Sequence, residues 1–315
     1  MHAPSATYYV GVDVAKDTLA IRRNPAAKIV VIPNTSDAVR PWLTSLSAGA
    51  HLICEATGRH HRLLQSECAL RGVPYTCLNP ARARAFALSL GCIEKSDPID
   101  AGVLERFGRE RQPPATVPPS PALRELSDLL MARRTVVEQV TAFTLRLPLL
   151  STQARRALQK VIIGLRAQRL SLDLALEAWL ESPQGACWCD KVYTLCLAPG
   201  VGVLSALSLI AHLPELGTLN RGQVAKLAGL APILWDSGTM KGLRTIKGGR
   251  REARRVLYQC ALVAARWHPP TTQHYQQLRQ RGKCASVAYV AIARKLLIYL
   301  NSLLRPASAA TSLEA

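Results

Sequence analysis

Four acidic side chains in the first hundred residues have the types and spacing of a site for divalent metal ions. Asp13 and Glu55 each follow an apolar run, and Asp97 and Asp100 are three residues apart where a helix is predicted to begin, so they share one helical face. Two Mg²⁺ ions about 4 Å apart need several carboxylate oxygens on rigid elements. Such ions would activate an attacking oxygen and neutralise charge on a phosphate. The spacing therefore predicts metal-dependent phosphodiester chemistry.

A second group lies in the C-terminal part, where a serine beside a glycine precedes a strongly basic stretch. Ser237 is that serine, and seven basic residues and one acid lie between Lys241 and Arg255. A small serine can approach a phosphodiester closely, and nearby cations would stabilise the charge that develops. The nearest histidines in the sequence are His212 and His268, and neither stands beside the serine. Activation therefore needs a metal ion or a carboxylate from another domain.

The elements that must hold the acids are predicted from periodicity. Strands are predicted at 8–14, 18–23, 28–33, 51–54 and 74–78, and helices at 36–47, 59–71 and 81–90. Hairpin strands followed by β-α-β units predict a mixed sheet with helices on its faces. Five prolines within 112–121 predict an exposed linker and a domain boundary. The stretch 122–181 has almost no Gly or Pro and has leucines at helical spacing, which favours two long helices in an antiparallel or intermolecular coiled coil.

The charge balance predicts a polyanionic partner. Over 315 residues, 40 Lys and Arg against 21 Asp and Glu give a net charge of +19. Residues 1–110 and 111–190 each carry +3, whereas residues 191–315 carry +13. Nucleic acid is the partner that this charge favours, and the C-terminal part should provide most of the contacts. The length suggests roughly two domains at about 150 residues each.

Compartment and membrane association are predicted from what the sequence lacks. The nine cysteines are scattered and odd in number, and residues 1–9 have neither the basic start nor the long apolar run of a secretory signal. No run of 18 uninterrupted apolar residues appears, so no membrane span is expected. A cytoplasmic protein is predicted.

Three segments together resemble a known family. Residues 11–17 (GVDVAKD), 54–58 (CEATG) and 95–101 (KSDPIDA) resemble the DEDD motif of the Piv-type transposases, which belong to the insertion-sequence family numbered one hundred and ten. The resemblance extends over about residues 8–304. It implies an α/β RuvC-like (RNase H-type) N-terminal domain over 1–112, a linker and helical coiled-coil arm over 113–190, and a mainly α C-terminal transposase domain over 191–315. It identifies Asp13, Glu55, Asp97 and Asp100 as acids that bind Mg²⁺.

The same resemblance implies a mechanism and partners. Ser237, in a Leu-Ala-Pro…Ser-Gly context, matches the serine with which the family is taken to attack DNA, giving a covalent phosphoserine intermediate. Members form homo-oligomers, here a dimer or tetramer, and a structured guide (bridge) RNA pairs with donor and target double-stranded DNA. Many relatives have Asn where this chain has Arg250, which puts local backbone or phosphate contacts in doubt. The basic residues predicted to contact phosphates are Lys241, Lys247, Arg250, Arg251, Arg254 and Arg255.

Other functions remain open at this stage. A Mg²⁺-dependent RuvC-like nuclease or junction resolvase would use the same acids with water in place of Ser237. An actin-like ATPase or sugar kinase also has an Asp after its first strand, but it needs further Gly-rich phosphate loops, and no clear second one is found. A catalytically silent nucleic-acid scaffold is the fourth possibility.

Overall fold

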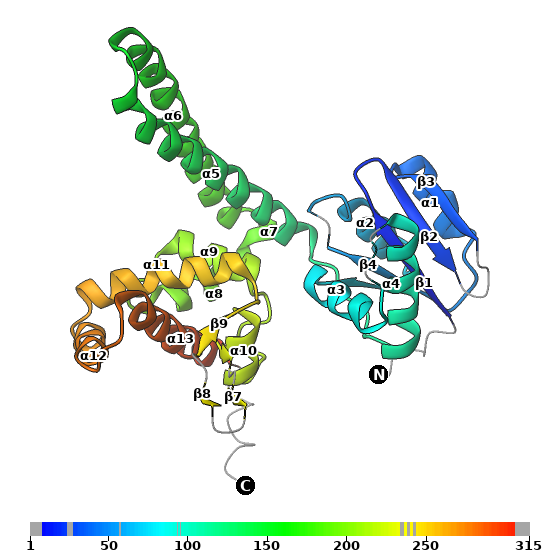
Figure 1. Ribbon diagram of the computed structural model, residues 1–315. Coiled ribbons are helices and arrows are strands. Elements are labelled where there is room, and N and C mark those ends of the chain that lie inside the picture. The colour runs from blue at the N-terminus through cyan, green and yellow to red at the C-terminus, as the bar shows by residue number, and fades with distance from the viewer. Residues whose placement is uncertain are drawn as a thin grey trace. The chain divides into compact units, whose positions relative to one another are not determined.

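The computed structural model describes residues 8–23, 28–56, 58–92, 94, 96–233, 236–237, 240–241 and 244–305. The chain divides into two compact units, Met1–Pro119 and Ser120–Ala315. Figure 1 labels the helices and strands of both units. All nine cysteines are free thiols, as the scattered pattern predicts.

The first unit is built on a mixed five-stranded sheet, as predicted. Its strands are β1 (Tyr8–Val14), β2 (Thr18–Arg23), β3 (Ile29–Pro33), β4 (Ala50–Glu55) and β5 (Tyr75–Leu78). The strand order is β3-β2-β1-β4-β5. The pairs β1–β2 and β2–β3 are antiparallel, whereas β1–β4 and β4–β5 are parallel. Because β1, β4 and β5 run in one direction, their carboxyl ends meet at one edge.

Two helical layers cover this sheet (Figure 1). Helices α1 (Ser36–Thr44) and α2 (Arg62–Leu70) bury apolar side chains against one face, together with Val12 and Leu52 of the strands. Helices α3 (Pro80–Ser89) and α4 (Asp97–Arg111) pack on a second core that includes Ile53. Neighbouring positions of β4 therefore point into different cores, as the two-residue period of a strand requires.

The proline-rich segment is mostly exposed, as predicted, but it is anchored to the sheet. The amide of Thr116 donates to the carbonyl of Tyr75 at 2.7 Å, and its hydroxyl accepts from the amide of Cys77 at 3.0 Å. Pro113 is buried. Prolines are tolerated here because the segment lies along an edge strand, where not every residue needs an N–H donor. The first compact unit ends at Pro119, within the proline-rich segment 112–121.

The second unit begins with two long helices, as predicted. Helix α5 (Pro121–Arg146) and helix α6 (Thr152–Glu181) pack against each other (Figure 1), and the 3₁₀ helix η1 (Leu147–Leu149) joins them. An ion pair between Arg133 and Asp173 connects the two helices. Helix α5 is also tied to the C-terminal helices, because Arg134 pairs with Glu252.

The rest of this unit is mainly helical. Its helices are α7 (Pro183–Ala186), α8 (Cys189–Cys196), α9 (Val203–His212), α10 (Arg221–Leu227), α11 (Arg251–Trp267), α12 (Pro269–Gln280) and α13 (Ala285–Leu303). Two short antiparallel pairs lie between α10 and α11. In these, β6 (Pro232–Ile233) pairs with β9 (Thr245–Ile246), and β7 (Asp236–Ser237) pairs with β8 (Met240–Lys241).

Among the described residues, α13 is long and apolar enough to cross a membrane. Its apolar side chains are used inside the fold, since Ile292, Leu297 and Leu300 are buried in the core of the second unit. Arg294 and Lys295 interrupt the apolar sequence. The burial of these side chains is typical of a helix in a protein core.

Candidate active site

Asp13 and Glu55 lie at the carboxyl ends of two neighbouring parallel strands. The last register pair between β1 and β4 is Val12 with Cys54, so the two acids follow it at equivalent positions. Both side chains are half-buried. The sheet therefore brings together two acids that are 42 positions apart in the sequence.

Both acids also belong to the sheet face that α4 covers. In β4, Cys54 is buried in the core with α1 and α2, whereas Ile53 is buried in the core with α3 and α4. Glu55 shares the face of Ile53, because alternate strand residues point to the same side. In β1, Val12 and Val14 face α1 and α2, which assigns Asp13 to the α4 face.

Helix α4 lies directly on β1 at a glycine. A Cβ atom on Gly11 would overlap the carbonyl oxygen of Ala101 and would lie 2.5 Å from the amide nitrogen of Glu105. About two helical turns beyond Ala101, a Cβ on Gly108 would lie 2.6 Å from the Tyr9 ring. Helix α4 thus runs opposite to β1, and its first turn lies towards the carboxyl end of the strand. Only glycine permits this approach of two backbones.

The first turn of α4 carries the other two acids. Ser96 is the N-cap residue, and its carbonyl accepts from the amide of Asp100 at 2.9 Å. Asp97 is exposed and Asp100 is half-buried. Acids are favourable there because the helix N-terminus is electropositive. The predicted quartet is therefore placed at one end of the first unit by β1, β4 and α4.

The four carboxylates suit a hard divalent cation such as Mg²⁺, which prefers oxygen ligands. Within the ranges that the structure describes, however, no three His, Cys, Asp or Glu side chains are close enough to hold a metal ion. The structure brings the acids to one edge without closing a cage around an ion. Thr57 and Lys95, which belong to the segments quoted above, lie outside the described residues.

Ser237 lies in a short hairpin between α10 and α11. It ends β7 and is paired with Met240 of the antiparallel strand β8. Gly238 lies outside the described residues. The antiparallel strand pair of Pro232 with Ile246 lies at the base of the same segment. We call residues 229–248 the serine segment.

The base of the serine segment is closed by Arg254 and by backbone contacts. The Arg254 guanidinium donates to the carbonyl of Gly248 at 2.5 Å and to that of Gly229 at 3.5 Å. The amide of Arg250 donates to the carbonyl of Leu227 at 2.8 Å. The two ends of the segment are therefore held together by one cation from α11.

A second arginine fixes the start of α11. Arg250 binds Glu215 through two hydrogen bonds of 2.5 and 2.6 Å and donates to the carbonyl of His212 at 3.0 Å. Burial alone would raise the pKa of Glu215, but the hydrogen bonds and charge of Arg250 lower it below its ordinary value. Such bidentate pairs combine charge with a fixed geometry.

The remaining predicted phosphate contacts differ in their surroundings. Lys247 and Arg251 are exposed, and Arg255 is exposed but lies 3.3 Å from Glu138 of α5. Lys241 lies in β8. Arg250 and Arg254 are half-buried and bound within the unit.

The sequence did not identify Glu215 as a partner of Arg250. Residues 191–315 contain only four acids, so each of them was a candidate partner for a cation.

Family models of transposases match both parts of the chain. A family model described as "Transposase IS116/IS110/IS902 family" matches residues 193–276. A second transposase model, for DEDD transposases of IS110, matches residues 10–153. The two matches cover both the acids and Ser237.

Curated relatives match over nearly the whole chain. The chain is 26% identical to the "Pilin gene-inverting protein" of Moraxella bovis, over 94% of this chain and 95% of the relative. The protein of the same name from Moraxella lacunata is 25% identical over the same shares. An IS110 protein of Streptomyces coelicolor is 28% identical over 64% of this chain and 48% of that protein. By these matches the chain is similar to the IS110-family transposases along almost its whole length, and it is a DNA recombinase or transposase.

Proposed function

We propose that this protein moves an insertion sequence by cutting and rejoining DNA through a covalent phosphoserine at Ser237. The observation that carries the proposal is the packing of α4 on Gly11, because it places Asp13 and Glu55 beside the helix start that holds Asp97 and Asp100. The serine oxygen attacks phosphorus, and the bond from phosphorus to one deoxyribose oxygen breaks. The hydroxyl proton leaves to solvent, and the departing oxygen takes one up. Attack by a second strand's hydroxyl then reverses the step and frees the serine.

We propose that the acidic edge of the first unit binds a divalent metal ion. Asp13, Glu55, Asp97 and Asp100 would hold Mg²⁺, which when bound supplies charge neutralisation at the phosphate. The four carboxylates carry the same charge as a phosphodiester and would repel it, so their proposed role is to hold the cation that balances both. Since they lie on the first unit and Ser237 on the second, we propose that acids of a partner subunit complete each site, in a homo-oligomer of two or four chains.

The finer architecture is part of the same proposal. The strand order β3-β2-β1-β4-β5, with two antiparallel and two parallel pairings, supports a RuvC-like (RNase H-type) N-terminal domain. The long pair of α5 and α6 supports a coiled-coil arm between the domains 1–112 and 191–315. We propose from this activity that the protein is soluble and acts in the bacterial cytoplasm.

Nucleic-acid binding is proposed for the basic stretch. Lys241, Lys247, Arg251 and Arg255 would contact the phosphate backbone of DNA or of a structured guide (bridge) RNA. Arg250 and Arg254, which are bound within the unit, would act mainly by holding the serine segment in place. The net charge of +13 on residues 191–315 supports a polyanionic partner but does not distinguish DNA from RNA.

A second candidate is inversion of a DNA segment. The two Moraxella relatives, named for inverting a pilin gene, match this chain almost end to end, which favours it. Both activities need the same strand exchange. Assaying Ser237→Ala and Asp13→Ala on a plasmid with element ends tests the proposal, because both variants should lose excision and inversion. Wild-type activity in either variant would refute the assignment of that residue.

A further inference from the structure

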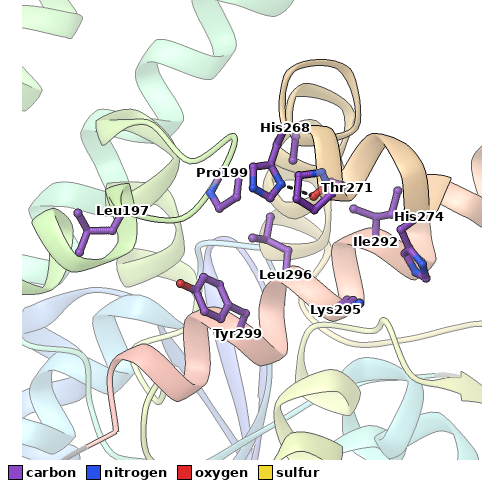
Figure 2. Close-up of a pocket in the computed structure, with 11 residues that line it drawn as sticks. Leu197, Pro199, His268, Thr271, His274, Ile292, Lys295, Leu296 and Tyr299 are labelled. Atoms are coloured by element: carbon purple, nitrogen blue, oxygen red, sulfur yellow. Dashed lines mark hydrogen bonds between the residues drawn. The ribbon is translucent and has the colours of Figure 1, made fainter. Parts of the chain in front are cut away.

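The second unit contains a pocket that neither the acids nor the serine segment uses. It has a volume of about 640 Å³ and lies between the turn after α8, the end of α11, helix α12 and helix α13 (Figure 2). A pocket of this size is typical of small-ligand sites. Of the residues that the structure describes, those that line the pocket include none from the serine segment and none of the basic residues proposed to contact phosphate.

The pocket combines an apolar floor with rings at its sides. Ile292 and Leu296 are buried, and they form the floor from α13. Figure 2 shows the Tyr299 ring and the His268 ring on two sides of the hollow, with Leu296 between them. Residue Tyr299 is 46% exposed, which leaves its ring available to a ligand. His268 Nδ1 and Thr271 Oγ1 share a hydrogen bond of 2.8 Å, which fixes the histidine ring.

The charge on this pocket is positive. Within the described part of the chain its lining includes Lys295 and no Asp or Glu, and Lys295 forms no ion pair there. Burial lowers the pKa of His274, and the charges of Lys295 and Arg281 lower it further. A positive potential beside an apolar floor favours an anion that also carries a flat apolar group.

We propose that this pocket binds one unstacked nucleotide, with its base over Leu296 and against the exposed Tyr299 ring, and with its phosphate beside Lys295. Proteins that bind unpaired bases stack them on aromatic or histidine rings and place cations along the backbone. Exchange of single strands between duplexes unpairs nucleotides at the point of exchange, so the site rests on the proposed strand exchange. The ligand chemistry is common to DNA and RNA.

The experiment uses the full-length protein and hairpin duplexes with one unpaired 2-aminopurine nucleotide, made once as DNA and once as RNA. The fully paired duplex of the same sequence is the reference. Variants Tyr299→Leu and Lys295→Gln remove the ring and the charge. Tyr193→Leu and Lys283→Gln are matched controls, because both residues are exposed and neither lines the pocket. Affinity and 2-aminopurine quenching are measured at constant salt.

The unpaired nucleotide should tighten binding by about tenfold and quench the fluorophore, since stacking of a base on an aromatic ring is of that order. Tyr299→Leu and Lys295→Gln should abolish the gain while the two controls keep it. The hairpin that binds more tightly, DNA or RNA, identifies the nucleic acid that supplies the unpaired nucleotide. Equal affinity for paired and unpaired duplexes, or a gain that survives Tyr299→Leu, would overturn the site. Failure to bind the fully paired duplex would instead count against the proposed function.

Discussion

Gly11 of β1 and Ala101 of α4 are in backbone contact, and a methyl group on Gly11 would overlap the carbonyl oxygen of Ala101. This contact sets the height of α4 above the sheet. It also sets the direction of the helix, because Gly108 of α4 meets Tyr9 nearer the start of β1. The first turn of α4 is thereby carried towards Asp13, and the acidic edge depends on a residue that has no side chain.

Replacing Gly11 should damage both stability and activity. In Gly11→Ala the added methyl group must push α4 away from β1, and overpacking of this kind costs about 1–3 kcal/mol. Unfolding in urea measures the loss, and strand exchange at a temperature where the variant is still folded measures the effect on the acids. Gly164→Ala is the control, because nothing lies within 4 Å of that position in α6. It should be neutral or stabilising by up to about 1 kcal/mol. Full activity in Gly11→Ala would show that the height of α4 is unimportant.

The clamp on the serine segment predicts a loss of chemistry without a comparable loss of binding. Arg254→Met removes the hydrogen bonds to Gly229 and Gly248 but keeps most of the side-chain length. We expect strand exchange to fall at least about tenfold, because reacting groups displaced by 1 Å can cost more than that. DNA affinity at fixed salt should change about twofold or less. A large loss of affinity at normal turnover would instead assign Arg254 to phosphate binding.

The salt dependence of DNA binding should separate exposed cations from paired ones. Lys247→Gln and Arg251→Gln should each reduce the slope of log affinity against log salt by about one. Arg250→Gln should leave the slope nearly unchanged, because that guanidinium is already bound to Glu215. Equal slopes for the three variants would contradict this division.

The Glu215–Arg250 pair predicts a pH-dependent contribution to folding. Arg250 lowers the pKa of Glu215 in the folded state, so the carboxylate stabilises the fold above its ordinary pKa of 4.5. This contribution should be lost as the pH falls below that value and through the lowered folded pKa. Denaturation of wild type and Glu215→Gln between about pH 7 and about pH 3 measures it. The two stability curves should converge at the acid end, and a constant difference across this range would contradict the pair.

Much of this arrangement could be predicted from local sequence. The strands, the two long helices and the four acids follow from two-residue and helical periods, which depend on neighbouring residues. The contact of Gly11 with Ala101 could not be predicted, because it depends on the height and direction of a helix far away in the sequence. The edge pairing of Thr116 with Tyr75 and Cys77, and the partner of Arg250, are likewise long-range. The sequence identifies Arg250 and Arg254 as cations, but only the fold shows that both already have hydrogen-bond partners within the unit.

The central claim is that Ser237 becomes covalently attached to DNA, and it is tested most directly by capture of that adduct. The protein is incubated with end-labelled DNA carrying the element's end and with Mg²⁺, denatured, digested and analysed by mass spectrometry. The account predicts one phosphoserine-linked peptide containing residue 237, which is absent from Ser237→Ala and from reactions without divalent metal. An adduct that persists in Ser237→Ala, or cleaved DNA with free ends and no adduct in the wild type, would contradict it and favour a nuclease that uses water.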